Sequence, residues 1–191
     1  QLFQLGKVAD KFGFIVAYPD ATRNAVNDRE WRVGYLYPNN PEWTHTPEEM
    51  QTELKYLTVD LLADVRQHLT ASAGCLEEWK PKRVFATGFS NGGDMAYKLA
   101  LLGLVDGVAP VAGCMLEALV AAGPAKAVPV CAFHGTRDTM TLYTGETTGD
   151  YPYISAEAAM KFWAEAAGLT RNSPIVQSIA PGVKRTKWSE Q

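Results

Sequence analysis

Short apolar runs that alternate with helix-like segments are the feature of this chain that most restricts its fold. The apolar runs are residues 14–18, 83–87, 107–111 and 127–133. The segments with helical periodicity are residues 1–12, 46 to about 70, 91–101 and 156–167. Continuous apolar runs of this length are typical of buried strands, and strands separated by helices form parallel sheets with right-handed crossovers. The sequence therefore predicts one α/β domain over residues 1–191, with a mostly parallel sheet flanked by helices.

The region between the first two strand-like runs is a long polar loop followed by a marked helix start. Thr46 and Glu49 have the spacing of a capping box, and Pro47 occupies the first helical position. A loop as long as residues 20–45 is usually functional or mobile in a compact domain. Its aromatic residues could line an acyl or aromatic pocket, or equally cap the core; they are Trp31, Tyr35, Tyr37 and Trp43.

The sequence Gly88-Phe89-Ser90-Asn91-Gly92 stands directly between a strand-like run and a helical segment. Small residues at this junction let the chain turn sharply and expose the serine in a strained conformation, which makes Ser90 the candidate nucleophile. The backbone N–H of Asn91, at the start of the following helix, is the candidate oxyanion donor. A glycine-rich turn can also bind phosphate, but neither G-x-x-x-x-G-K-[ST] nor G-x-G-x-x-G occurs at this turn, and their absence favours the serine hypothesis.

A second candidate segment, His134-Gly135-Thr136-Arg137-Asp138, follows the last apolar run. It would share the carboxyl edge of the sheet with Ser90, where ligands bind in such folds. Asp138 comes after the serine, as the acid does in the Ser…Asp…His order of triads built on a G-x-S-x-G turn, and would orient a histidine; alternatively it only terminates a turn.

The chain offers no convincing general base for this serine. Its histidines are His45 in the long loop, His68 in a helical segment and His134. His134 stands too near Asp138 in the chain to be favoured as the base, and we expect it to be a residue at the strand end. Without a base, the hydroxyl of Ser90 is a poor nucleophile at neutral pH.

The chain resembles the polyhydroxybutyrate-depolymerase-like esterases of the α/β-hydrolase superfamily, which include feruloyl and acetyl-xylan esterase relatives. The matching segments run in order and are residues 13–20, 59–60, 83–93, 95–97, 109–113 and 134–138. Their specificity lies in the combination of the Ser-Asn-Gly-Gly turn, Met95, Tyr97 and the His-Gly-Thr-x-Asp segment. The chain departs from the family pattern at three places. Leu61 follows Asp60 where the family usually has a second acid, Thr139-Met140-Thr141 follows Asp138 where relatives commonly have Pro and Val, and the loop at residues 20–45 is longer and more aromatic than usual. These departures concern substrate choice more than reaction type.

This resemblance implies a serine esterase in which Ser90 is the nucleophile, Asp138 the triad acid and the N–H of Asn91 an oxyanion donor. The family's catalytic histidine would lie beyond Gln191, and its other oxyanion loop would precede the first helix. We therefore expect a single α/β-hydrolase domain that is incomplete at both ends and inactive for want of the histidine. The expected reaction is hydrolysis of polyhydroxyalkanoate, feruloyl or acetyl esters through an acyl-enzyme, without a cofactor or metal. Secretion is expected because relatives are often exported.

The resemblance implies an ester substrate as the partner, either a small molecule or a polymer, and composition argues against other kinds of partner. Hydrophobic residues make up 47% of the chain, enough for a sizeable core. The net charge of −3 and the small basic clusters argue against nucleic acid, and no apolar stretch is long enough to span a membrane. Three cysteines do not have metal-site spacing and are interpreted as buried thiols, or as one disulfide with a thiol left over; they are Cys75, Cys114 and Cys131.

Two other functions stay open at this point. One is a catalytically inactive binding protein with the α/β-hydrolase fold. The other is a serine peptidase or acyltransferase, which would use the same turn on an amide or with an acceptor other than water.

Overall fold

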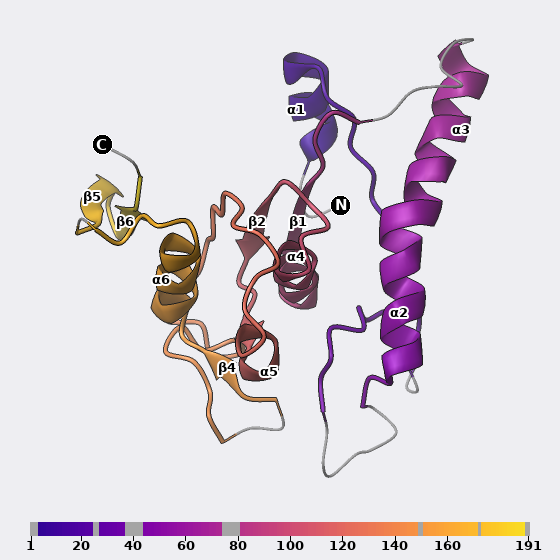
Figure 1. Cartoon of the computed structure of the whole chain (residues 1–191). Helices are drawn as coiled ribbons and strands as arrows, with labels where there is room; N and C mark the ends of the chain where they lie inside the picture. The colour runs from indigo at the N-terminus through magenta and orange to yellow at the C-terminus, as the bar shows by residue number, and fades with distance from the viewer. Residues whose placement is uncertain are drawn as a thin grey trace. The chain divides into compact units, whose positions relative to one another are not determined.

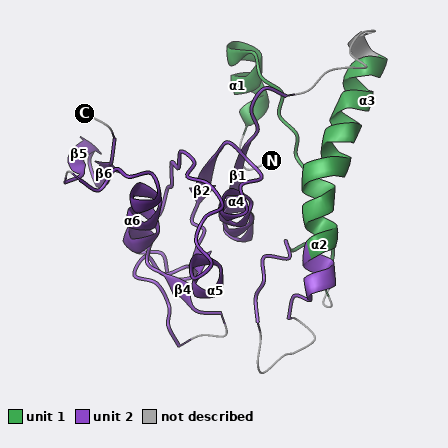
Figure 2. Ribbon diagram, in the orientation of Figure 1, with its two compact units in different colours: residues 1–30, 51–80 green, residues 31–50, 81–191 purple. Residues whose placement is uncertain are grey.

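The computed structural model of the chain describes six stretches, residues 4–24, 27–36, 44–73, 81–148, 151–171 and 173–189. The chain divides into two compact units (Figure 2). Unit 1 consists of Gln1–Glu30 and Gln51–Lys80, and unit 2 of Trp31–Met50 and Pro81–Gln191. The candidate catalytic residues Ser90, Asn91 and Asp138 all belong to unit 2. The prediction that residues 1–191 act as one catalytic domain stays a prediction.

The helices before the first strand follow the predicted pattern closely (Figure 1). Helix α1, Leu5–Phe12, ends at Gly13, whose φ of +70° is the left-handed conformation that glycine adopts at helix ends. Helix α2, Pro47–Lys55, continues through a π-helical turn, Tyr56–Asp60, into α3, Leu61–Ala73. Within that turn, the Thr58 hydroxyl donates to the carbonyl of Leu54 at 2.7 Å, a local bond that competes with regular helix bonding.

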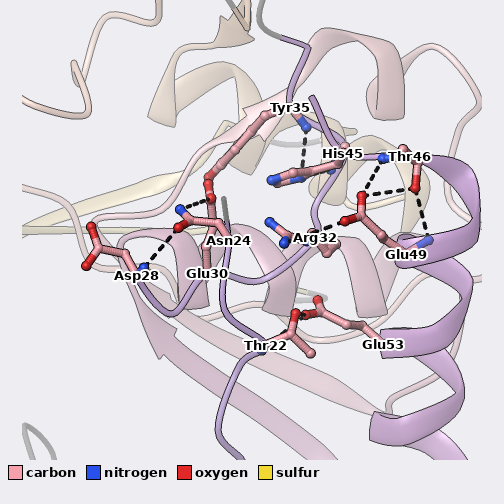
Figure 3. A network of polar contacts seen from close by, with 11 residues as sticks. Thr22, Asn24, Asp28, Glu30, Arg32, Tyr35, His45, Thr46, Glu49 and Glu53 are labelled. Atoms are coloured by element: carbon pink, nitrogen blue, oxygen red, sulfur yellow. Dashed lines mark hydrogen bonds and ion pairs between the residues drawn. The ribbon is translucent and has the colours of Figure 1, made fainter. Parts of the chain in front are cut away.

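The capping box predicted at the start of α2 is confirmed. The N–H of Glu49 donates to the Thr46 hydroxyl at 3.2 Å, and the N–H of Thr46 donates to the Glu49 carboxylate at 2.9 Å (Figure 3). These reciprocal bonds satisfy two backbone donors at the helix start.

The prediction of a buried strand at residues 14–18 is wrong. This segment of unit 1 has no regular secondary structure and no strand partner among the described residues, and Phe14, Ile15 and Tyr18 are 46%, 49% and 45% exposed. An apolar run becomes a strand only where neighbouring strands accept and donate its backbone hydrogen bonds.

A short parallel ladder lies at the centre of unit 2. Strand β1, Phe85–Phe89, pairs in parallel with β2, Gly107–Val111, in the register Phe85↔Gly107 to Phe89↔Val111. Residues 130–133 continue the ladder beside β2 through the parallel bridges Val108↔Val130 and Val111↔Phe133. Helix α4, Asn91–Leu101, packs against β1 and β2 and buries residues 93–101. Three of the four predicted strand segments thus lie side by side and parallel.

The remaining strands of unit 2 pair in antiparallel fashion, so the parallel pairing seen among the described residues is limited to β1, β2 and residues 130–133, and the mostly parallel sheet stays a prediction. Strand β3, Met115–Leu116, pairs with β4, Tyr153–Ile154, and β5, Ile175–Ala180, forms a hairpin with β6, Val183–Lys187. Helix α5, Glu117–Val120, follows β3. Helix α6, Ala156–Ala166, starts at Ser155, whose hydroxyl accepts from the N–H of Ala158 at 3.1 Å.

No helix in the described stretches combines the length and the apolar character that crossing a membrane requires.

Candidate active site

Ser90 occupies the sharp connection between β1 and α4. Its φ of +53° and ψ of −124° form a strained conformation for a residue other than glycine, and its side chain is exposed. Its N–H donates to the carbonyl of Val111 at the end of β2, at 2.9 Å. The serine therefore has the exposed, strained position that the G-x-S-x-G pattern predicts. Its role as the nucleophile stays a prediction.

Close backbone contacts explain why glycines surround this serine. A Cβ on Gly88 would lie 2.3 Å from the carbonyl oxygen of Gly92. A Cβ on Gly113 would lie 2.7 Å from the carbonyl carbon of Gly93. The first turn of α4 is thereby packed directly against the end of β1 and against the loop that follows β2.

Asn91 uses its backbone and its side chain differently. Its backbone N–H belongs to the first turn of α4, where N–H groups have no intrahelical acceptor and the helix dipole is positive. Its side-chain oxygen accepts from the N–H of Trp31 at 2.7 Å, and its side-chain nitrogen donates to the Trp31 carbonyl at 3.1 Å. The side chain thus binds the loop at residue 31, and the backbone N–H is the group that an oxyanion could use.

Asp138 lies in a turn of the loop that follows residues 130–133. One carboxylate oxygen accepts from the N–H groups of Met140 and Thr141 at 2.9 and 3.0 Å. These backbone hydrogen bonds hold the pKa of Asp138 below its usual value, so the group is a carboxylate at neutral pH. The alternative prediction, that Asp138 forms a turn, is therefore confirmed, because its carboxylate binds two backbone N–H groups of its own loop.

The ladder brings the loops of Ser90 and Asp138 to the same edge. The N–H of Ser90 bonds to Val111, and the N–H of the next residue, Ala112, donates to the carbonyl of Phe133 at 2.8 Å. The carboxyl ends of β1, β2 and residues 130–133 therefore adjoin, with β2 between the two loops. This is the sheet edge at which parallel folds bind their ligands.

None of the three histidines has a hydrogen bond to Ser90 among the described residues. Nε2 of His134 donates to the carbonyl of Thr141 at 2.7 Å and lies 3.9 Å from the Asp138 carboxylate, so His134 is a residue of the loop after the strand, as expected. Nδ1 of His45 accepts from the N–H groups of Gly34 and Tyr35 at 3.0 and 3.2 Å (Figure 3). His68 lies exposed on α3 in unit 1.

A buried polar group that the sequence did not reveal lies beneath this turn. Asp94, in the first turn of α4, is 5% exposed; its carboxylate accepts from the Tyr35 hydroxyl and, at 2.5 Å, from the N–H of Cys114. Burial raises the pKa of Asp94 to about 6 and, with the Asp94 charge, also raises the pKa of the Tyr35 hydroxyl and the Cys114 thiol. The available signal was the helical spacing of three polar residues, Asn91, Asp94 and Lys98, in a helix whose other residues are apolar or glycine.

The other predicted residues have mixed outcomes. Tyr35 is buried and stacks on Tyr151 with ring centroids 4.5 Å apart, so it caps the core, whereas Trp31 is half-buried. Cys114 is a buried free thiol, but Cys131 is an exposed one, which corrects the prediction of burial. Tyr37, Trp43 and Cys75 lie outside the described residues. The described stretches contain no group of three or more histidine, cysteine and acidic residues suited to a metal ion.

Comparison with known proteins identifies relatives of the chain. Residues 6–148 match the Dienelactone hydrolase family. Among curated proteins, Feruloyl esterase B from Piromyces equi is 28% identical over 177 residues, an alignment that covers 87% of this chain. The chain spans only 29% of the length of that relative. No solved structure matches the chain.

Proposed function

We propose, from the premise that this chain belongs to the dienelactone hydrolase family, that it cleaves carboxylic esters through Ser90. Membership brings the α/β-hydrolase fold with it, and together with the feruloyl esterase similarity it confirms the esterase-like resemblance of the sequence. The mostly parallel sheet, the serine mechanism and the ester that is cleaved belong to the proposal. The observation that carries it is the strained, exposed position of Ser90 between β1 and α4, on the sheet edge that also bears Asp138.

The proposed reaction has two displacements. The hydroxyl oxygen of Ser90 attacks the ester carbonyl carbon, and the N–H of Asn91 stabilises the negative oxygen of the tetrahedral intermediate. The alcohol leaves with a proton, and water then attacks the acyl-enzyme to release the acid. A histidine held by the Asp138 carboxylate is the proposed base, and the engaged positions of His45 and His134 favour a different histidine from those two.

We propose feruloyl, acetyl or polyhydroxyalkanoate esters as the substrate class. The feruloyl ester is supported by the name of the relative, and the polyhydroxyalkanoate ester by the sequence resemblance alone. Export from the cell, and an ester rather than a nucleic acid or a membrane as the partner, belong to the same proposal.

Substitution of the serine tests this function. In the whole protein, Ser90→Ala is expected to lower kcat on p-nitrophenyl acetate and methyl ferulate by at least about a thousandfold. Ser178→Ala is the matched control, because Ser178 is exposed on β5 and should leave turnover unchanged. A serine-directed phosphonate should label the parent and the control but not Ser90→Ala. Turnover that survives Ser90→Ala would contradict the proposal.

A non-catalytic binding protein is the second candidate. It is favoured by the absence, among the described residues, of a histidine that bonds to Ser90. Such a protein would bind an ester without turning it over, and it would resist the phosphonate. Comparing hydrolysis of an ester with that of the matching amide, and transfer to water with transfer to an added alcohol, separates an esterase from a peptidase or acyltransferase.

A further inference from the structure

The buried carboxylate of Asp94 has no part in the chemistry proposed above, although it lies four residues after the proposed nucleophile. It joins two segments that are far apart in the chain. The Tyr35 hydroxyl donates to one carboxylate oxygen, and the backbone N–H of Cys114 donates to the other at 2.5 Å. An acidic side chain in the first turn of α4 therefore binds both the loop at residue 35 and the loop that follows β2.

The same tyrosine connects Asp94 to Asn91. The side-chain nitrogen of Asn91 donates to the Tyr35 hydroxyl oxygen at 3.2 Å, while that hydroxyl donates its proton to Asp94. The side chain of Asn91 also accepts from the N–H of Trp31 and donates to the carbonyl of Trp31. The hydrogen bonds form one continuous chain from Trp31 through Asn91, Tyr35 and Asp94 to Cys114.

A third side chain of α4 attaches the same loop. Lys98 is buried, and its ammonium group donates to the carbonyl of Arg32 at 2.8 Å. Asn91, Asp94 and Lys98 follow one another at helical spacing of three and four residues, so they lie on one face of α4. Residues 31–35 therefore lie along this face and are held to it by polar side chains at three successive levels.

Burying this carboxylate is unfavourable in itself. A charged group removed from water is costly unless hydrogen bonds compensate, and replacing buried ionic groups with apolar ones of similar size is often neutral or stabilising. What an apolar side chain could not do is accept two hydrogen bonds from two separate loops. The distinctive contribution of Asp94 is therefore to fix these loops against the turn that bears Ser90.

We infer that Asp94 is a positioning residue for the proposed ester hydrolysis. Through Tyr35 it orients the side chain of Asn91, and through Cys114 it holds the loop after β2, so that the backbone of the turn at Ser90 and Asn91 is clamped between the two. This inference rests on the proposed function, because it assigns the clamp to the serine and to the N–H that would bind the oxyanion.

The clamp should act on the chemical step more than on substrate binding. Both the attacking oxygen and the oxyanion donor belong to the clamped turn, and a displacement of about 1 Å in a catalytic group can lower a rate by about a hundredfold. Loss of the clamp should therefore lower kcat by about 10- to 100-fold while KM changes by less than about threefold.

The test removes one hydroxyl group. Tyr35→Phe keeps the ring but deletes the link between Asn91 and Asp94. Tyr97→Phe is the matched control, because Tyr97 is a buried tyrosine of the same helix whose hydroxyl has no hydrogen bond among the described residues. Each variant of the whole protein is measured for kcat and KM on p-nitrophenyl acetate and for amide hydrogen exchange by NMR.

Hydrogen exchange gives a readout that does not depend on turnover. In Tyr35→Phe, the amides of Trp31 and Cys114, which donate to Asn91 and Asp94, should exchange about tenfold faster or more. The amide of Tyr153, which donates to Glu146 at 2.8 Å in the same unit, should be unchanged and reports general loosening. Tyr97→Phe should change neither amide and neither kinetic constant.

Three results would overturn the inference. They are unchanged exchange at Trp31 and Cys114, exchange that rises equally at Tyr153, and a fall in kcat no larger than that of Tyr97→Phe. If Tyr35→Phe does not fold, the nearly isosteric Asp94→Asn replaces it and is judged by the same criteria. Turnover that survives Ser90→Ala would overturn the proposed function and, with it, the role of Asp94 in ester hydrolysis. The exchange pattern would then still decide separately whether Asp94 holds the turn.

Discussion

Replacing Gly88 with alanine should both destabilise unit 2 and disable the turn at Ser90. Gly88 is the second-last residue of β1, two residues before the serine. Its added Cβ would lie 2.3, 2.4 and 2.8 Å from the carbonyl oxygen, carbonyl carbon and Cα of Gly92. All three atoms are backbone atoms, so no flexible side chain can move aside.

The magnitude follows from the displacement that this contact requires. Extending it to an acceptable separation of about 3.2 Å moves the first turn of α4 by about 1 Å. There is little space for that movement, because a Cβ on Gly93 would lie only 3.1 Å from the Cα of Gly113. Overpacking of this kind costs about 1–3 kcal/mol, and a clash between backbones belongs at the upper end. A loss of about 3 kcal/mol corresponds to a fall in Tm of about 6–12 °C for a domain of this size.

Thermal unfolding followed by near-ultraviolet circular dichroism measures this loss. Gly135→Ala is the matched control, because its Cβ would have nothing closer than the N–H nitrogen of Asp138 at 4.0 Å. The free energy of unfolding of Gly135→Ala should lie within about 0.5 kcal/mol of the parent's value. If Gly88→Ala melted within about 2 °C of the parent, the contact between β1 and α4 would not be as close as described, and the explanation of the glycine would be refuted.

Three further changes have definite expected outcomes. Burial raises the pKa of Asp94 to about 6, so protonated Asp94 contributes up to about 3 kcal/mol to the free energy of unfolding below pH 4, and this contribution is lost as the pH rises through 6. Urea unfolding across this pH range should show the loss in the parent but not in Asp94→Asn, and parallel pH dependences of the two would count against it. Ser155→Ala should lower the free energy of unfolding by about 1 kcal/mol because it removes the cap of α6. Ser155→Asp should retain the parent's stability in the same urea titration, and an equal loss in both variants would exclude capping. Met115→Ala should lower the free energy of unfolding by about 2–5 kcal/mol because Met115 is 1% exposed. Met140→Ala, at a residue that is 90% exposed, should change it very little. Equal falls in Tm for the two variants would show that Met115 does not belong to the core.

Local chemistry made several features predictable from the sequence alone. The capping box of Thr46 and Glu49 and the cap of α6 at Ser155 depend on residues three positions apart, so their spacing is visible in the chain. The turn at Ser90 was predictable for the same reason, since an apolar run, flanking glycines and a helical pattern are contiguous. The helix at residues 91–101 was predicted with its observed limits.

Features that depend on a distant partner were settled only by the tertiary structure. Residues 14–18 have the composition of a buried strand, yet no strand among the described residues pairs with them. The pairing of β3 with β4 joins two-residue segments, too short for any periodicity to show. Asp94 looked like one polar residue in a helix, because its partners Tyr35 and Cys114 are 59 and 20 residues away in the chain.

The division between the two has a physical reason. A turn or a cap is stabilised by atoms that the chain itself brings together within one helical turn, so the sequence by itself determined where Ser90 stands and how its helix begins. The stability of a buried carboxylate depends on which donors reach it after folding, and that is a property of packing. The sequence therefore predicted the serine, and only the tertiary structure revealed the Trp31–Asn91–Tyr35–Asp94–Cys114 chain of hydrogen bonds beneath it.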